Sequence, residues 1–578
     1  MIDPIVREAR GIDLTDDVLI LDEAHNVENF ARESASFVCN VADIAAVANE
    51  LEKIITTCVD CIGATRLIDP YRKLKCLLES ILCLVENVTS SDAFVETDDC
   101  ESGLFHGSEM VSLLQSSSIT HDEVERCRHA FDFILQFDKG DISKRFKGVE
   151  PHPHMSQDIK HIHTLLQVTE QQDERIDSKC SSLSCNPKQL SGKRRRYRPH
   201  RGSEDVLTNT KTRQRLWVSN CMQLTRSLIT VLSYVVGNTE DYGLLVERRV
   251  VNFLTVITVK LNCLNAAVCF KHIFRIARSV VVTSGTLTPL DSFSGELGVC
   301  FETCKSLPHI IDVARQLYIG VAGTGPDNLR LEATFQYSSR LDFQNSIGKA
   351  LVDYCGVIPG GIIVFFPSYR LMDQLVTRWR GCGIWTELVD CKSAVFVEPT
   401  RRGAAFDNIV HSYKSACIHG RGALLFAVCR GKLSEGIDFK DNACCAVIII
   451  GIPYPHSRDI TVHQKMKWND RTRLLRNRKH LQTGTQWYEM QAFRAVNQAM
   501  GRVVRHRYDF GAIILMDIRF RNKHVVQQLP QWVRPAVSTS PTSHKFILEQ
   551  LNIFYNTIHK NLTELARERG DPHMHFPL

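Results

Sequence analysis

Short runs of valine and isoleucine constrain the fold of this 578-residue chain more than any other feature. The runs are Val18–Leu21, Val280–Val282, Ile362–Phe366, Leu424–Val428, Val447–Ile450 and Ile513–Met516. Because they do not alternate with polar residues, they are typical of strands that a parallel sheet buries on both faces. Segments with helical spacing lie between them, among them Leu371–Arg380 and Trp487–Met500. The runs cluster in two places along the chain, so the sequence predicts an α/β fold with two parallel sheets.

The composition is that of an ordinary globular protein, with 44% hydrophobic and 23% charged residues. It excludes collagen-like and mucin-like chains, and the longest apolar runs, such as Ala446–Ile450, are too short to span a membrane. The net charge of +6 is a weak indication of nucleic-acid binding over this length. The 21 cysteines are scattered, many of them within apolar runs. This distribution favours free thiols in a reducing compartment over a disulfide framework.

The pattern changes between about residues 40 and 236, where strand signals are few. Ile44–Ile55 and Tyr71–Val85 have the apolar spacing of helices, which predicts a mainly helical insertion. Within it, residues 170–215 are polar and rich in Ser, Arg and Lys. Such a stretch cannot bury enough apolar surface to offset the entropy of ordering, so we expect disorder or loop there.

The most specific signal is Asp22-Glu23-Ala24-His25, which directly follows the first predicted strand. Ligands of open α/β sheets bind at this end of the strands. Of two neighbouring carboxylates there, one can hold Mg²⁺, usually through water, and the other can orient and deprotonate an attacking water molecule. An exposed acidic turn is the alternative for these four residues taken alone. The preceding apolar strand favours a nucleotide phosphate site.

A second signal lies in the segment 498–505, where Gln498, Arg502 and Arg505 would share one face of a helix. An arginine pair presented in this way can stabilise a departing γ-phosphate. The alternative is a solvated basic helix face.

Three further segments follow predicted strands. In Arg430–Phe439, glycines and small polar residues let backbone N–H groups approach phosphates, although an ordinary strand-to-loop connection is the alternative. Thr283–Leu287 and Phe365–Tyr369 are weaker signals of the same kind. Each segment is a weak signal alone, but their common position after strands makes them hard to dismiss together.

Taken together, the motifs resemble those of superfamily 2 DNA helicases. The matching segments for motifs II, III, V and VI are Asp22–His25, Ser284–Thr286, Arg430–Phe439 and Gln498–Arg505. Their order and spacing resemble the xeroderma pigmentosum group D branch, in which a helical arch separates motif II from motif III. Several phrases look most like the Fanconi anaemia group J helicases, with the telomere-elongation regulator helicases close behind. These phrases are Ala31–Ser36, Ala333–Gln336, Ala427–Lys432 and Gln486–Glu489.

This resemblance implies two RecA-like parallel-sheet motor domains, the first incomplete, with a mainly helical arch insertion. We expect a remnant of motor domain 1 with the D-E-A-H box in residues 1–45 and the arch-like insertion in residues 46–240. The chain would return to motor domain 1 in residues 241–312. Motor domain 2 would occupy residues 313–530, and a C-terminal helical extension residues 531–578.

The resemblance also implies roles for single residues and a function. Asp22 would bind Mg²⁺, Glu23 would activate water, and His25 would couple the nucleotide site to the DNA site. The other expected site residues are Ser284 and Thr286 as transmitters of the nucleotide state, Gly436 and Asp438 in the interdomain cleft, and Gln498, Arg502 and Arg505 against the ATP phosphates. Helicases of this kind use ATP to translocate 5′ to 3′ on single-stranded or forked DNA, and the group J type acts in DNA repair in the nucleus.

Two family elements are missing from this sequence. It contains no G-x-x-x-x-G-K-[ST] loop, because Gly192-Lys193, Gly348-Lys349 and Gly431-Lys432 are followed by Arg, Ala and Leu. The four iron–sulfur cysteines of the family, ligands of a [4Fe–4S] cluster, would also lie upstream of Met1. We therefore expect a helicase without its N-terminal portion and with negligible ATP turnover. The pair Cys58 and Cys61 falls after motif II and is more typical of a structural role than of a metal site.

The basic run Lys193–Arg201 is typical of a nuclear localisation signal or a phosphate-binding patch, with a solvated loop as the alternative. A non-catalytic DNA-binding or scaffolding protein derived from a helicase is the alternative to an ATP-dependent helicase. A scaffold has no chemical need for Glu23 or Arg505. Their presence favours the helicase.

Overall fold

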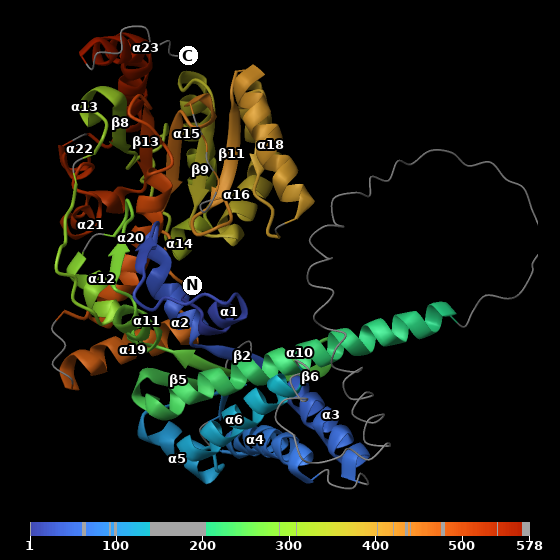
Figure 1. The fold of residues 1–578 in the computed structure, drawn as a ribbon. Helices are drawn as coiled ribbons and strands as arrows, with labels where there is room; N and C mark the ends of the chain where they lie inside the picture. Colours follow the sequence, from blue (N-terminus) through green and yellow to red (C-terminus); the bar gives the residue numbers. More distant parts are fainter. Residues whose placement is uncertain are drawn as a thin grey trace, which may run out of the picture. The chain divides into compact units, whose positions relative to one another are not determined.

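The computed structural model describes residues 2–59, 65–91, 94–96, 101–138, 204–287, 290–307, 309–401, 403–419, 421–433, 437, 439, 441–475, 480–539 and 541–568 (Figure 1). The chain forms two compact units. One comprises Met1–Asp17 and Glu28–Arg278, and the other comprises Val18–Val27 and Ser279–Leu578. No helix in the described ranges is both long enough and apolar enough to cross a membrane.

A six-stranded parallel sheet forms the centre of the second unit, with the strand order β10-β11-β9-β12-β13-β8. The strands are β8 (Leu317–Val321), β9 (Ile362–Phe366), β10 (Ala394–Val397), β11 (Ala423–Val428), β12 (Ala446–Ile450) and β13 (Gly511–Met516). Every residue of β9, β11, β12 and β13 is buried, as apolar runs without alternation predict. The predicted fold class, α/β with parallel sheets, is confirmed.

Helices cover both faces of this sheet, and several of them lie beside the strands in Figure 1. On one face, Phe365 and Leu425 pack with α18 (Ala404–His419), α20 (Gly484–Met500), α21 (Lys523–Gln528) and α22 (Arg534–Thr539). On the other, Val364 and Phe426 pack with α15 (Leu341–Val357), α16 (Tyr369–Gly381), α17 (Ile384–Cys391) and α23 (His544–Glu568). Further elements of this unit are α12 (Leu290–Leu297), α13 (Val313–Gln316), α14 (Phe335–Ser338), α19 (Ile460–Leu475) and the short 3₁₀ turns Asp441–Ala443 and Ile518–Arg521.

A separate parallel pair in the second unit holds the D-E-A-H sequence. It consists of β1 (Val18–Leu21) and β7 (Ser279–Val282), with Leu21 opposite Val282. The prediction that Val18–Leu21 and Val280–Val282 are buried on both faces is wrong, because Val18 is 57%, Ile20 65% and Val281 45% exposed. In the described part of the chain, these strands form a two-stranded sheet of their own. A pair this small leaves apolar side chains in contact with water.

The first unit is built on a five-stranded antiparallel sheet of order β2-β6-β5-β4-β3. The strands are β2 (Phe37–Asn40), β3 (Phe94–Glu96), β4 (Glu101–His106), β5 (Tyr242–Val251) and β6 (Leu254–Cys263). β3 and β4 lie in the stretch for which few strands were expected. Their sequences, FVE and ESGLFH, are short and poor in β-branched residues, so they carry little strand signal.

The helices of the first unit are α1 (Pro4–Ala9), α2 (Val27–Ser34), α3 (Val41–Val59), α4 (Thr65–Thr89), α5 (Ser108–Ser116), α6 (His121–Asp138), α10 (Glu204–Gly237) and α11 (Ala267–Ile276). α3 and α4 confirm the helices predicted over Ile44–Ile55 and Tyr71–Val85. Since α10 begins at Glu204, the prediction of loop or disorder for residues 170–215 is wrong for its last residues. The rest of that segment, including the basic run Lys193–Arg201, lies outside the described residues.

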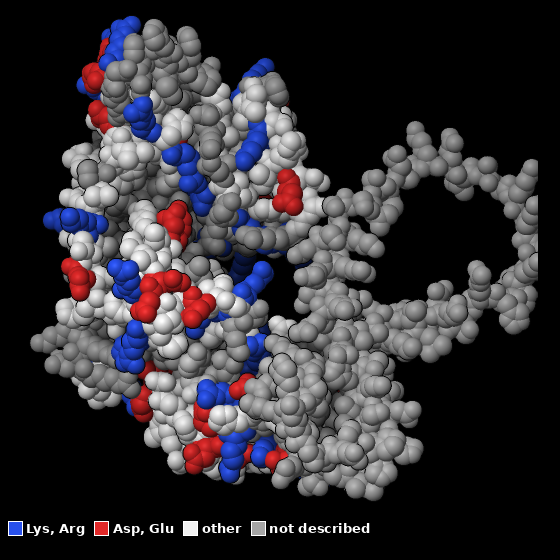
Figure 2. All heavy atoms as spheres, viewed as in Figure 1, with Lys and Arg blue, Asp and Glu red and all other residues white. Residues whose placement is uncertain are grey.

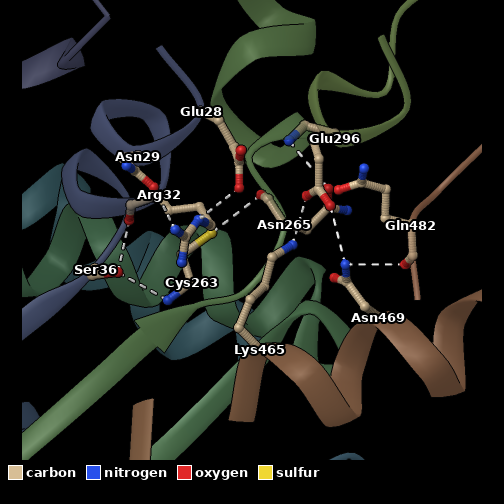
Figure 3. A network of polar contacts seen from close by, with 11 residues as sticks. Glu28, Asn29, Arg32, Ser36, Cys263, Asn265, Glu296, Lys465, Asn469 and Gln482 are labelled. Carbon is tan, nitrogen blue, oxygen red and sulfur yellow. Dashed lines mark hydrogen bonds and ion pairs between the residues drawn. The ribbon is translucent and has the colours of Figure 1, made fainter. Parts of the chain in front are cut away.

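Polar contacts join the end of α2 to β6 within the first unit (Figure 3). The Arg32 guanidinium lies 3.7 Å from the fully buried carboxylate of Glu28. The Ser36 hydroxyl donates to the Arg32 carbonyl and accepts from the Cys263 backbone N–H, at 2.7 and 2.9 Å. The Ser36 hydroxyl therefore attaches the segment after α2 to the antiparallel sheet.

Candidate functional site

The acidic pair lies immediately after β1, at the carboxyl ends of the β1–β7 sheet. Asp22 and Glu23 are exposed. The Asp22 Oδ1 accepts from the Glu23 backbone N–H at 2.9 Å and from the Thr283 hydroxyl at 3.2 Å. The Ala24 N–H donates to the Thr283 carbonyl at 2.9 Å. The register of the parallel pair thus brings the segment after β1 against the segment after β7.

A second set of contacts joins Glu23 and His25 to Ser284. The Ser284 hydroxyl donates to the Glu23 Oε2 at 3.1 Å, and the His25 Nδ1 lies 2.9 Å from the same hydroxyl. His25 is buried, whereas the Glu23 side chain is 67% exposed. The Thr286 backbone N–H donates to the Ser284 Oγ at 3.3 Å, which brings the last residue of this segment into the cluster.

The Glu23 backbone is held in the left-handed region, with φ of 50° and ψ of 41°. A residue other than glycine is uncommon there and costs about 1 to 3 kcal/mol, and such strain concentrates at functional sites. The conformation begins the 3₁₀ turn Ala24–Asn26 and leaves the Glu23 carboxylate exposed at the end of the sheet. The same carboxylate also lies 3.2 Å from the His25 Nδ1, so a hydroxyl and a ring nitrogen fix its position.

Glu398 binds the backbone of the loop after β11. The sequence analysis assigned no role to this residue. Its carboxylate is 2% exposed and accepts from the backbone N–H groups of Val428 and Leu433 at 2.8 and 3.1 Å. The Tyr369 hydroxyl also donates to Glu398, at 3.1 Å. The pKa of Tyr369 is raised to about 12, mainly by burial and to a smaller extent by the neighbouring Glu398 carboxylate. The hydroxyl therefore remains a hydrogen-bond donor at neutral pH.

Arg430 lies in the turn that Glu398 supports. The Gly431 N–H donates to the Val428 carbonyl at 2.8 Å, and Arg430 takes φ of 61°, in the left-handed region. Desolvation of its guanidinium lowers the pKa of Arg430, and the charge of Arg494 acts in the same direction. Two neighbouring guanidinium groups suit an anionic ligand such as a phosphate.

The prediction that Gln498, Arg502 and Arg505 share one face of a helix is wrong, because α20 ends at Met500. Gln498 lies in its last turn, and both arginines lie in the turns that follow. The Arg502 Nη1 donates to the Ile437 carbonyl at 2.7 Å, so this side chain contacts the loop after β11. The Asp509 carboxylate accepts from the backbone N–H groups of Arg505 and His506 and fixes the turn that carries Arg505.

Two of the predicted site residues, Gly436 and Asp438, lie outside the described residues. Cys61 and the side chain of Cys58 also fall outside them. Among the residues that the structure describes, no group of three or more His, Cys, Asp or Glu side chains lies together so as to hold a metal ion. The cysteines whose side chains the structure describes are free thiols.

Figure 2 shows the charged side chains of the described residues on one face of the molecule. On the face shown in Figure 2, Lys and Arg side chains are interspersed with Asp and Glu side chains.

Comparisons with known proteins identify two matched segments. Residues 351–536 match the family model described as "Helicase C-terminal domain", and residues 1–44 match the model DEAD_2. Over these two segments, the chain is similar to the DEAD_2 and helicase C-terminal families. The DEAD_2 match contains Asp22, Glu23 and His25, and the helicase C-terminal match contains the six-stranded sheet except β8.

Curated relatives match over nearly the whole of this chain. It is 32% identical over 586 aligned positions to a Fanconi anemia group J protein homolog from Gallus gallus, covering 100% of this chain and 43% of that protein. It is 30% identical over 586 positions to a Regulator of telomere elongation helicase 1 homolog from Drosophila melanogaster, covering 98% of this chain and 54% of that one. The chain thus spans about half the length of the curated relatives it matches.

Solved structures of similar chains include one titled XPD helicase, with a TM-score of 0.41 and 14% identity, covering 90% of this chain and 69% of that one. Another is the Xpd4 protein of S. tokodaii, with a TM-score of 0.42 and 12% identity, covering 90% and 75%.

Proposed function

We propose that this chain is the greater part of the motor of an ATP-dependent 5′ to 3′ DNA helicase that acts in DNA repair in the nucleus. The observation that carries the proposal is the bonding of Glu23 and His25 to Ser284. Glu23, an exposed residue with a strained backbone, follows β1, and the Ser284 hydroxyl that binds it follows the neighbouring strand β7. Such a contact could pass a change at the nucleotide from one segment to the other. The group J protein homolog among the relatives supports the repair assignment.

The chemistry assigned to the acidic pair follows from its donor set. Asp22 is an exposed carboxylate, and oxygen ligands of this kind suit Mg²⁺, which Asp22 would hold. When bound, the ion would neutralise charge on the ATP phosphates. Glu23 would orient and deprotonate the attacking water, and Ser284 would pass the state of Glu23 to His25 and Thr286.

The groups on the other side of the proposed site would come from the helicase C-terminal region. Arg502 and Arg505 would meet the ATP phosphates, with Gln498 beside them, and Gly436 and Asp438 would line the cleft. The convergence of the acidic pair and these arginines on one triphosphate stays a prediction. The sequence contains no P-loop, so we expect this polypeptide alone to hydrolyse ATP at close to the background rate.

Two other functions have specific support. A non-catalytic DNA-binding or scaffolding role is favoured by the missing P-loop. A telomere-elongation regulator type of helicase is favoured by relatives of that name, whose identities are close to that of the group J homolog.

The experiment compares DNA-stimulated ATPase activity and single-stranded DNA binding of this chain with those of a version extended by the upstream coding sequence. We expect the chain to bind DNA without appreciable turnover and the extended version to hydrolyse ATP. In the extended version, Glu23→Gln should lower turnover by roughly 10²- to 10⁴-fold, as loss of a general base does, while nucleotide binding persists. Glu33→Gln, at an exposed position on α2, is the matched control.

The outcomes separate the candidates. An extended protein that contains a P-loop and still lacks ATPase activity would support the scaffold. ATP hydrolysis by the present chain would contradict the expectation that turnover requires a P-loop.

A further inference from the structure

The hairpin of β5 and β6 extends past its neighbours in the antiparallel sheet of the first unit. Pairing of β4 with β5 reaches only to Arg248, and pairing of β2 with β6 reaches only to Thr258. β5 and β6 continue to pair with each other up to Val251 and Leu254. Residues 249–257 therefore form a two-stranded finger with no further strand beside it in the described part of the chain.

The tip of this finger is apolar and exposed. Val250 is 72% exposed, Val251 50%, Phe253 102% and Leu254 70%. The sequence carries no charged residue from Val250 to Val259. Large exposed apolar side chains grouped in this way are unfavourable in water and mark interaction sites.

The turn at the tip holds Phe253 in a left-handed backbone conformation that glycine adopts more readily than phenylalanine. Asn252 has φ of 51° and Phe253 has φ of 64°, so both are in the left-handed region. Two-residue hairpin turns of this kind favour Asn followed by Gly, because a side chain at the second position is strained. The strained position directs a complete aromatic ring into solvent, which points to a contact made by the ring.

The small size and the charge of the finger favour a nucleic-acid base as its binding partner over the surface of another protein. A stable protein interface buries about 800 Å² on each partner, which the few side chains at this tip cannot supply. A single base needs only one uncharged ring face, and stacking of this kind changes affinity by roughly 5- to 150-fold per base. At the foot of the finger, Arg248, Arg249 and Lys260 share the two carboxylates Glu101 and Glu247, which leaves an excess of positive charge for a phosphate backbone.

We propose that the finger of residues 249–257 binds single-stranded nucleic acid by stacking Phe253 on a base, with Leu254 against the neighbouring base. This inference rests on the proposed function, for which it names a nucleic-acid contact in the first unit. The relevant chemistry is stacking on an unpaired base.

The test measures binding of a fluorescently labelled 20-nucleotide single-stranded DNA to the whole chain by anisotropy, together with thermal unfolding. Phe253→Leu should weaken binding by roughly 5- to 150-fold, and Phe253→Trp should restore it because the ring returns. Phe253→Gly should weaken binding and raise the unfolding temperature, because glycine removes the strain. Phe30→Leu, at a residue on α2 that is 53% exposed, is the matched control and should change neither property.

A photocrosslink from a 5-iodouracil base in the same oligonucleotide should map to the peptide that contains Phe253. If the unaltered chain does not bind the oligonucleotide, the nucleic-acid part of the proposed function fails and the inference fails with it. If the chain binds and Phe253→Leu binds equally well, the inference alone is overturned. A Phe253→Gly variant that loses self-association at unchanged DNA affinity would assign the finger to a protein contact and also overturn it.

Discussion

At the end of β10, the Glu398 carboxylate accepts hydrogen bonds from Val428, Leu433 and Tyr369. An alanine at this position would leave buried backbone donors without acceptors, at a cost of roughly 1 to 3 kcal/mol for each. The loop after β11 carries Arg430 in a strained backbone conformation, so it depends on these bonds to keep its shape. Glu398 is therefore a positioning residue for the proposed phosphate-facing loop.

We expect Glu398→Ala to lower both the free energy of unfolding and the affinity for single-stranded DNA. Glu398→Gln keeps one acceptor oxygen and should recover most of the affinity. Tyr369→Phe removes only the hydroxyl bond and serves as the control for that contact. Urea unfolding and DNA anisotropy on the same samples check this. A Glu398→Ala protein of unaltered DNA affinity would remove the positioning role.

At the scale of elements, α12 (Leu290–Leu297) is joined to α19 by a fully buried ion pair (Figure 3). The Lys465 Nζ lies 2.7 Å from the Glu296 Oε2, and the Asn469 amide donates to the other carboxylate oxygen at 3.1 Å. Lys465 also lies 4.3 Å from the ring centroid of Trp468 and 5.9 Å from that of Trp487 on α20. The pair thus connects three helices within the second unit.

Removing one partner of this ion pair should lower the free energy of unfolding much more than replacing both partners with apolar residues. Glu296→Ala leaves a buried lysine charge without its partner, and we expect a loss of about 3 to 5 kcal/mol in the free energy of unfolding. The double variant Glu296→Leu with Lys465→Met removes both charges and should fall close to the unaltered protein. Equilibrium urea unfolding compares the three proteins. A single variant as stable as the double variant would contradict this account.

At the scale of the whole molecule, buried thiols report separately on the two units. Burial raises the pKa of Cys355, Cys429 and Cys445 in the second unit to about 12. It raises the pKa of Cys127 and Cys263 in the first unit to about 12 and about 11. In each case the raised pKa keeps the folded-state thiol protonated and unreactive near neutral pH. Unfolding returns these thiols to their ordinary range.

Pulsed alkylation at pH 8 along a urea gradient, read by mass spectrometry, should therefore give one midpoint for the second-unit thiols. The two first-unit thiols should share a midpoint of their own. The exposed Cys382 should react without urea and serves as the reference. Labelling of Cys355 in native buffer as fast as Cys382 would show that the core of the second unit is open.

The sequence alone determined six of the strands, their place in parallel sheets and the acidic pair, because these features depend on local patterns. An unbroken run of Val and Ile favours a strand wherever it lies, and a carboxylate pair after a strand is recognisable from its neighbours. Only the tertiary structure decided which groups meet. Glu398 was missed because its partners lie about thirty residues away in the sequence. The end of α20 at Met500 and the exposure of β1 likewise depend on packing with distant segments, which local periodicity does not encode.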